Sequence, residues 1–146
     1  MSITKDLYFV AVKVFLRDGT KLLITKDRFG AWDLPGGRLR EMDFLTSLEE
    51  VVARKVKEEL GEFVTYKLAM PTVFMRHERD EILSDGGSEK RRIFALGYEA
   101  EYLGGDIKLG QNHELYEWVD VNDFIPENYF TGGWLSGVKE YLLKTK

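Results

Sequence analysis

The sequence LPGGRLREMDFLTSLEEVVARKVKEELG, residues 34–61, decides the fold that we expect of this chain. It opens with the glycine pair Gly36-Gly37, which fits a turn better than the interior of a strand or a helix. The loop at residues 38–46 is polar and irregular in pattern, and residues 47–60 predict an amphipathic helix. A glycine turn and the end of a helix are therefore expected to lie side by side.

The predicted helix carries its own start and stop signals. Ser47 is a good N-cap, Glu50 completes a capping box three residues later, and Gly61 stands where helices commonly end. Apolar residues recur at helical spacing along one face: Leu48, Val51, Val52, Val56 and Leu60. The last turns present the adjacent carboxylates of Glu58 and Glu59. Together with a backbone carbonyl from the glycine turn, these carboxylates suit a hard divalent cation.

The same stretch resembles the Nudix box, whose family pattern is G-x5-E-x7-R-E-U-x-E-E-x-G-U, where U is a large apolar residue. The residues that match this pattern are Gly37, Arg54, Val56, Glu58, Glu59 and Gly61. The resemblance implies an α+β fold, a Nudix-like α/β/α sandwich in which a mixed β-sheet is packed between helices. It also implies that residues 1–146 form a single Nudix hydrolase domain.

Four features depart from the family pattern. The segment from Gly37 to Arg54 is three residues longer than the pattern, so the loop at residues 38–46 is expected to carry an insertion. Thr46 then stands where the first glutamate belongs, and Lys55 stands where the glutamate after the arginine belongs. Glu62 replaces the last apolar residue.

The rest of the chain supplies strands on both sides of this helix. Apolar patterns predict extended segments at residues 7–15, 21–25, 64–76, 93–102 and 116–119, and a second helix at residues 134–143. Pro71 is expected to place the middle of the third segment at a sheet edge or a bend. Residues 84–88 predict a loop. Lys90, Arg91 and Arg92 follow it, either as a solvated turn or as a clamp for a diphosphate.

The composition limits the class of protein. The 146 residues are 44% apolar and 32% charged, which is typical of one folded domain. Cysteine is absent, which excludes disulfides, thiolate metal sites and cysteine nucleophiles. The net charge of −4 argues against a nucleic-acid partner. No run of about 18 apolar residues predicts a membrane span, and the first residues do not resemble a signal peptide, so we expect a cytoplasmic protein.

The resemblance assigns roles to residues of the box. It implies that Mg²⁺, with Mn²⁺ as an alternative, is bound by Glu58, Glu59 and the carbonyl of Gly37. Arg54 corresponds to the family arginine that orients a box glutamate, and Glu58, four residues later, is its expected partner. Lys55 can neither ligate a cation nor act as a base unless its pKa is strongly depressed. Either the base lies elsewhere or the enzyme is impaired.

A second stretch offers a base. Asn112, His113 and Glu114 resemble the segment that, in GDP-mannose mannosyl hydrolases, supplies a metal-ligating amide and a histidine base. Asn112 then matches the metal ligand and His113 the base, since a neutral imidazole suits the deprotonation of water near neutral pH. In ordinary Nudix enzymes the acid at this place, here Glu114, lies nearer the metal. The sequence leaves both alternatives open.

Arg28, Arg38 and Tyr129 are candidates for binding the substrate, with packing of the second helix as the alternative role of Tyr129. The expected function is magnesium-dependent hydrolysis of a nucleoside diphosphate linked to another group. Cleavage would fall in the P–O–P linkage or, as in mannosyl hydrolases, at the sugar carbon. A degenerate domain that binds a nucleotide without hydrolysing it is the alternative. The expected partner is a small-molecule nucleotide, and a homodimer remains open.

Overall fold

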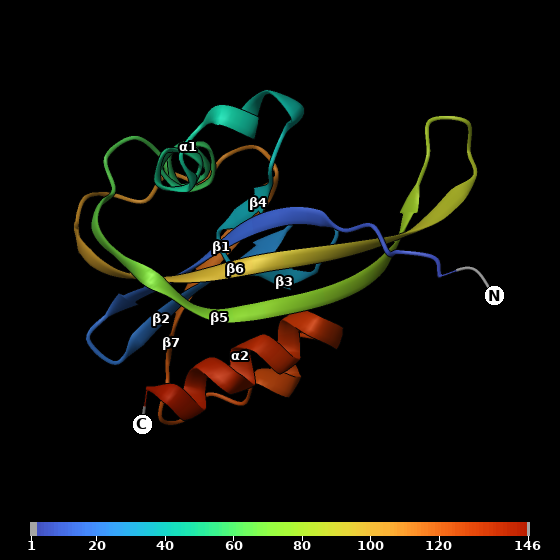
Figure 1. Cartoon of the computed structure of the whole chain (residues 1–146). Helices are drawn as coiled ribbons and strands as arrows, with labels where there is room; N and C mark the ends of the chain where they lie inside the picture. Colours follow the sequence, from blue (N-terminus) through green and yellow to red (C-terminus); the bar gives the residue numbers. More distant parts are fainter. Residues whose placement is uncertain (1–2, 146) are drawn as a thin grey trace.

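The chain forms a seven-stranded mixed sheet with one long helix on each face (Figure 1). The structure is a computed structural model that describes residues 3–145. In chain order its elements are β1 (Phe9–Asp18), β2 (Lys21–Asp27), β3 (Trp32–Asp33), β4 (Gly36–Arg38), the 3-10 helix η1 (Glu41–Leu45), α1 (Leu48–Leu60), β5 (Thr65–Ile82), β6 (Ser88–Gly104), β7 (His113–Asp120), the 3-10 helix η2 (Pro126–Asn128) and α2 (Gly132–Lys144).

The strand β1 is the centre of the sheet. The main order is β3-β2-β1-β6-β5, with β4 paired to β1 and β7 paired to β2. The pairing of β1 with β6 is parallel and the other pairings are antiparallel, so the sheet is mixed. The predicted α+β sandwich with helices on both faces is confirmed.

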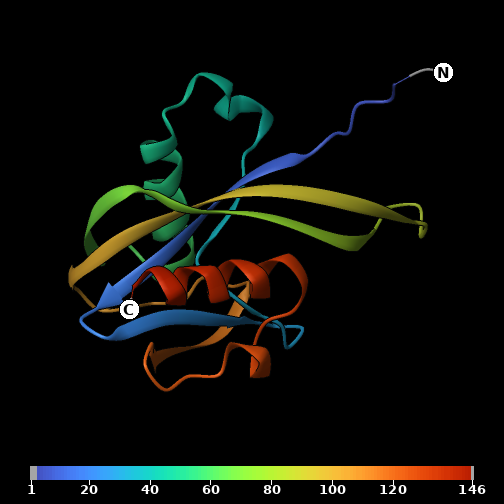
Figure 2. The ribbon, with the colours of Figure 1, turned by 60° about the horizontal axis from the view of Figure 1, so that its bottom comes forward.

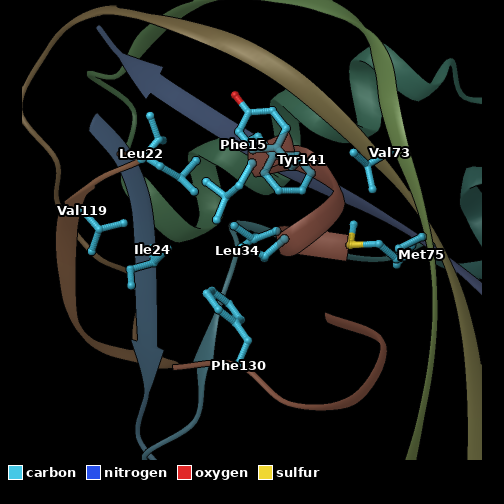
Figure 3. Close-up of a cluster of buried hydrophobic side chains, with 14 of the residues drawn as sticks. Phe15, Leu22, Ile24, Leu34, Val73, Met75, Val119, Phe130 and Tyr141 are labelled. Carbon is cyan, nitrogen blue, oxygen red and sulfur yellow. The ribbon is translucent and has the colours of Figure 1, made fainter. Parts of the chain in front are cut away.

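Each face of the sheet has its own hydrophobic core. On the α2 face, the ring of Phe15 stacks on that of Tyr141 with centroids 4.1 Å apart, and Figure 3 shows apolar side chains from several strands around this pair. On the α1 face, the buried side chains of Val51, Val52 and Val56 pack over apolar residues of β1 and β6. The two cores hold both helices against one sheet.

Within residues 3–145, no helix combines the length and apolar character needed to cross a membrane.

The helix α1 follows the sequence prediction closely. It begins at Leu48, and the Oγ atom of the N-cap Ser47 accepts a hydrogen bond of 3.2 Å from the backbone N–H of Glu50. Four residues of the predicted apolar stripe are buried, whereas Leu48 is only partly buried at the first turn. The helix ends at Gly61, whose φ of 96° is accessible to glycine at little cost.

The hairpin of β5 and β6 is much longer than the sequence predicts. Its outer half pairs opposite charges across the strands, with Glu78 opposite Arg92 and Asp80 opposite Lys90. Lys90, Arg91 and Arg92 therefore lie in a strand and not in a turn. Charge pairs replace the apolar alternation by which strands are recognised. The end of this hairpin projects beyond the two helices (Figure 1 and Figure 2).

The expectation for Pro71 is confirmed, because it lies in β5, the strand at the edge of the main sheet order, with a shift of register on each side of it. The short strand β4 falls at the glycine pair, where we expected a turn, and the two-residue strand β3 was not predicted. Strands of two or three residues have too few positions for a pattern to appear in the sequence.

Candidate functional site

A cleft of about 510 Å³ lies where α1, β4, the segment before β7 and the start of α2 meet. Its floor is formed by residues of β1 and β3, and its rim includes Arg79 of the long hairpin. Eight charged side chains line it: the cations of Lys13, Arg38, Arg40, Lys55 and Arg79, and the carboxylates of Asp33, Glu58 and Glu59. The cleft therefore gathers the predicted acidic pair and several cations into one space.

The glycine pair is held tightly beside β1. Gly36 has a φ of 144°, and a β-carbon added there would lie 2.0 Å from the carbonyl oxygen of Val12. The neighbouring Pro35 accepts a 2.8 Å hydrogen bond from the backbone of Val14 through its carbonyl oxygen. The N–H of Gly36 is left pointing toward α1, where it donates to Oε2 of Glu59 at 3.1 Å. The turn thus fixes one box carboxylate through its backbone.

Glu59 is the enclosed member of the acidic pair. Its side chain is 14% exposed, and its Oε1 lies 3.3 Å from Nε2 of His113. Burial raises the pKa of Glu59 to about 7, an effect that Lys13 and the N–H of Gly36 partly oppose and the charge of Asp33 reinforces. Burial therefore favours the protonated form of this carboxyl in the absence of a bound cation. A buried carboxylate of this kind gains most from a nearby positive charge.

Arg54 forms the predicted ion pair with Glu58 and also has a closer partner that we did not predict. Its guanidinium forms two hydrogen bonds, of 2.5 and 2.8 Å, with the carboxylate of Asp43, whereas its Nε atom is 3.6 Å from Glu58. Asp43 lies in η1, is 2% exposed, and also accepts a 2.7 Å hydrogen bond from the backbone N–H of Arg40. The pairs with Arg54 and this N–H hold the pKa of Asp43 well below its ordinary value.

This pair corrects the alignment of the box. Asp43 stands six residues after Gly37, which is the spacing of the first acid in the family pattern, and it contacts the arginine of the box. Asp43, and not Thr46, therefore holds the place of that acid. The three extra residues lie between Asp43 and Arg54, so they extend the entry into α1 and leave the glycine turn unchanged. Counting backward from Arg54 by the family spacing leads to Thr46, so that count does not reveal the role of Asp43.

Glu58 is the open member of the acidic pair. Its side chain is 39% exposed and accepts hydrogen bonds of 3.0 and 3.3 Å from Nη2 of Arg40. The Nζ atom of Lys55 lies 3.9 Å from its Oε2 atom. The two adjacent carboxylates therefore differ: Glu59 is enclosed by the protein and Glu58 faces the cleft among cations.

The segment before β7 is fastened to the end of α1. The backbone N–H of Lys108 donates to the carbonyl of Leu60 at 2.8 Å, and that of Gly110 donates to the carbonyl of Glu59 at 3.1 Å. A β-carbon on Gly110 would lie 2.3 Å from the carbonyl oxygen of Glu58, so this close approach requires glycine. The contact carries Asn112 and the next residue to the cleft wall.

His113 and Glu114 lie on opposite sides of β7. His113 lines the cleft with an 11% exposed side chain, whereas Glu114 is exposed and does not line it. Burial lowers the pKa of His113, so its imidazole is neutral near pH 7. Its Nδ1 atom is buried and has no hydrogen-bond partner among residues 3–145. The nitrogen that faces the acidic pair is Nε2.

An ion pair that we did not predict lies on the cleft floor. The Nζ atom of Lys13 lies 2.9 Å from both carboxylate oxygens of Asp33, and the residue is only 5% exposed. A lysine inside the apolar run of β1 was a signal for such a pair, because buried lysines need a partner. The same Nζ lies 4.9 Å from the ring centroid of Trp134, and His77 stacks on this ring at 4.4 Å.

Two predicted substrate-binding residues lie outside the cleft lining. Arg28 donates a hydrogen bond to the backbone carbonyl of Gln111, which makes it a support for the cleft wall. Tyr129 packs edge-on against Trp32 of β3 with ring centroids 5.2 Å apart, beside the core cluster that includes residues of α2. Arg38 does line the cleft, and its Nη2 atom bonds Glu81 at 2.6 Å.

The donors present suit a divalent cation only in part. Within residues 3–145, no three His, Asp or Glu side chains are grouped so that they could hold a metal ion. Glu58 and Glu59 supply two carboxylates, and backbone carbonyls of the glycine turn supply further hard oxygen donors. These residues fit a site in which two carboxylates hold the cation. They do not fit a site with three carboxylates from the box, because Lys55 stands where the family pattern has the glutamate after the arginine.

Comparison with known proteins finds similar sequences and similar folds. A family model of the NUDIX domain matches residues 7–134. The nucleoside triphosphatase NudI of Escherichia coli O81 (strain ED1a) is 27% identical to this chain over 96 residues. The matched residues make up 66% of each protein, so the match spans slightly less than two thirds of NudI.

Solved structures share the fold. The MutT protein from Methanosarcina mazei Go1 superposes with a TM-score of 0.68 at 22% identity and 99% coverage of both chains. An ADP-ribose pyrophosphatase from Streptococcus suis 89-1591 superposes with a TM-score of 0.62 at 15% identity, covering 96% of this chain and 93% of that chain.

Proposed function

Because the chain belongs to the NUDIX family, we propose that it hydrolyses a nucleoside diphosphate linked to another group, with the help of a divalent cation. The charge of the cleft carries this proposal. The whole chain has a net charge of −4, yet the cleft is lined by five cationic side chains and three carboxylates. A local excess of positive charge in an acidic protein favours an anionic ligand.

The arginines are suited to binding the phosphates. Arg38 bonds Glu81 at 2.6 Å and Arg40 bonds Glu58 at 3.0 Å, so carboxylates hold both guanidiniums at the rim of the cleft. Each guanidinium has five N–H donors, and one carboxylate engages only some of them. The remaining donors can bind phosphate oxygens in the planar geometry that arginine favours.

Glu58 and Glu59 would hold the cation, together with the carbonyl of Gly37 and the amide oxygen of Asn112. Use of divalent metals is general among Nudix hydrolases, and hard oxygen donors favour Mg²⁺, with Mn²⁺ as an alternative. When bound, such a cation neutralises the diphosphate oxygens and makes a water molecule easier to deprotonate. A cation held there would favour the charged form of Glu59, whose pKa burial raises to about 7.

We assign the general base to His113. Its imidazole is neutral near pH 7, and its Nε2 atom faces the acidic pair, so this atom would take the proton of the attacking water. Glu114 is exposed outside the cleft lining and is the weaker candidate. Attack on phosphorus then breaks a P–O bond, and the leaving phosphate departs with the bridging oxygen.

A second candidate is displacement at the sugar carbon, as in GDP-mannose mannosyl hydrolases. It is favoured by Lys55 in the place of a box glutamate, combined with a histidine that points into the cleft. Turnover in ¹⁸O-labelled water separates the two reactions. Cleavage at phosphorus places the label in a phosphate, and cleavage at carbon places it in the released sugar.

The test is a panel of nucleotide sugars, dinucleotides and nucleoside triphosphates, assayed with Mg²⁺ and with EDTA. We expect cation-dependent product release from at least one nucleoside diphosphate derivative. Glu58→Gln and Glu59→Gln should each remove most of this activity while the circular dichroism spectrum stays unchanged. Unchanged turnover in both variants would contradict the cation assignment. Nucleotide binding by calorimetry without any turnover would instead support a binding domain.

A further inference from the structure

Lys55 occupies an unusual place for a lysine. It lies on the inner face of α1, is 9% exposed, and its ammonium lies in the lining of the cleft. The end of its side chain packs against the glycine turn: a β-carbon added to Gly37 would lie 3.1 Å from both Cε and Nζ. Between the glycine turn and the acidic pair, the available space is therefore filled by an ammonium group.

The surroundings of this ammonium are those of a cation site. Its Nζ atom lies 3.9 Å from Oε2 of Glu58. Burial lowers the pKa of Lys55 and the charges of Arg40 and Arg54 act in the same direction, whereas the charges of Glu58 and Glu59 oppose them. An apolar side chain would fill this space without the cost of desolvating a charge, so packing alone does not explain a lysine here.

We propose that the Lys55 ammonium replaces one divalent ion between Gly37 and Glu58, and that it binds an oxygen of the substrate diphosphate. The second half of this proposal rests on the proposed function, because that function is what identifies the substrate as a diphosphate. A tethered ammonium supplies fixed positive charge to phosphate oxygens, but it only donates hydrogen bonds and cannot join a metal coordination sphere. The cleft should then hold one divalent ion fewer than it would hold with glutamate at this position.

The number of bound Mn²⁺ ions tests the first part of the proposal, measured on the full chain by electron paramagnetic resonance of free Mn²⁺. We expect Lys55→Glu to bind one more ion than the parent chain. Lys55→Gln removes the cation and adds an amide oxygen, so it should bind Mn²⁺ about tenfold more tightly than the parent. Lys57→Glu is the matched control, because it makes the same change of charge on an exposed side chain of α1.

The outcomes separate this proposal from the proposed function. If Lys55→Glu gains no ion and Lys55→Gln gains no affinity, the lysine does not replace a metal ion, whatever the parent chain binds. If Lys57→Glu gains an ion as well, the effect is general charge and the proposal is overturned. A parent chain that binds no Mn²⁺ would contradict the proposed cation site, yet a gain of one ion in Lys55→Glu would still support the role of Lys55.

Binding of inorganic pyrophosphate in EDTA tests the second part. Because no divalent ion is then available, the affinity depends on the side chains of the cleft alone. We expect Lys55→Gln to weaken pyrophosphate binding about tenfold, with Lys57→Gln unchanged. Equal affinities of Lys55→Gln and the parent chain would show that the ammonium does not contact the diphosphate. Circular dichroism of each variant establishes that it is folded.

Discussion

Replacing Gly36 by alanine should damage the fold and the cleft together. The residue has a φ of 144°, and a β-carbon there would lie 2.0 Å from the carbonyl oxygen of Val12. That carbonyl belongs to β1, which pairs with β4, so the clash is with backbone and cannot be relieved by a rotamer change. The N–H of Gly36 also holds Glu59, so moving β4 away from β1 displaces a carboxylate of the acidic pair.

The expected loss in the free energy of unfolding is the sum of a backbone cost and a steric cost. A residue other than glycine in a sparsely populated backbone region costs about 1–3 kcal/mol. Forcing an atom into a filled space costs about 1–3 kcal/mol more. Gly36→Ala should therefore lower the free energy of unfolding by roughly 2–6 kcal/mol, a large share of the ~5–15 kcal/mol that is typical of a domain.

Gly104→Ala is the matched control for this prediction. Gly104 has a φ of 124° and nothing within 4 Å of an added β-carbon, so its substitution incurs the backbone cost alone, about 1–3 kcal/mol. Urea unfolding followed by tryptophan fluorescence measures both variants. The reasoning is refuted if Gly36→Ala is as stable as Gly104→Ala, because the clash with β1 would then contribute nothing.

Three further predictions concern other parts of the molecule. His113→Ala should lower turnover of an accepted substrate about a hundredfold to ten-thousandfold, while Glu114→Gln has little effect; the reverse order would assign the base to Glu114. Asp43 has a lowered pKa because of its pair with Arg54, so its carboxylate contributes stability above its ordinary pKa of 3.8 that is lost as the pH falls through its folded-state value. Urea unfolding from neutral pH to about pH 3 should therefore show a smaller acid-induced loss of stability in Asp43→Asn than in the parent chain, and equal slopes would contradict the pair. Tyr141→Phe removes a buried hydroxyl with two side-chain partners and should cost about 1–3 kcal/mol in the free energy of unfolding; a change below about 0.5 kcal/mol would show that the partners are rehydrated.

Local signals in the sequence determined the central helix and the glycine turn. The N-cap Ser47, the apolar stripe and Gly61 act within a few residues of one another, so the helix could be bounded to within one residue. The acidic pair Glu58 and Glu59 follows from the same local pattern, since their place on the last turn of α1 depends only on helical geometry. The family resemblance then supplied the sandwich and the orientation of this helix toward the glycine turn.

Only the tertiary structure decided which side chains meet. Asp43 contacts Arg54 although the insertion between them hides their relation in the sequence; only its spacing from Gly37 matched the family pattern. Lys13 and Asp33 come from different strands, and His113 lines the cleft while Glu114 does not, since successive residues of β7 face opposite sides. The outer half of the β5–β6 hairpin is held by charges that pair across strands. Each of these contacts joins residues that lie apart in the chain, and the energy of such a contact depends on burial and geometry that only the folded backbone creates.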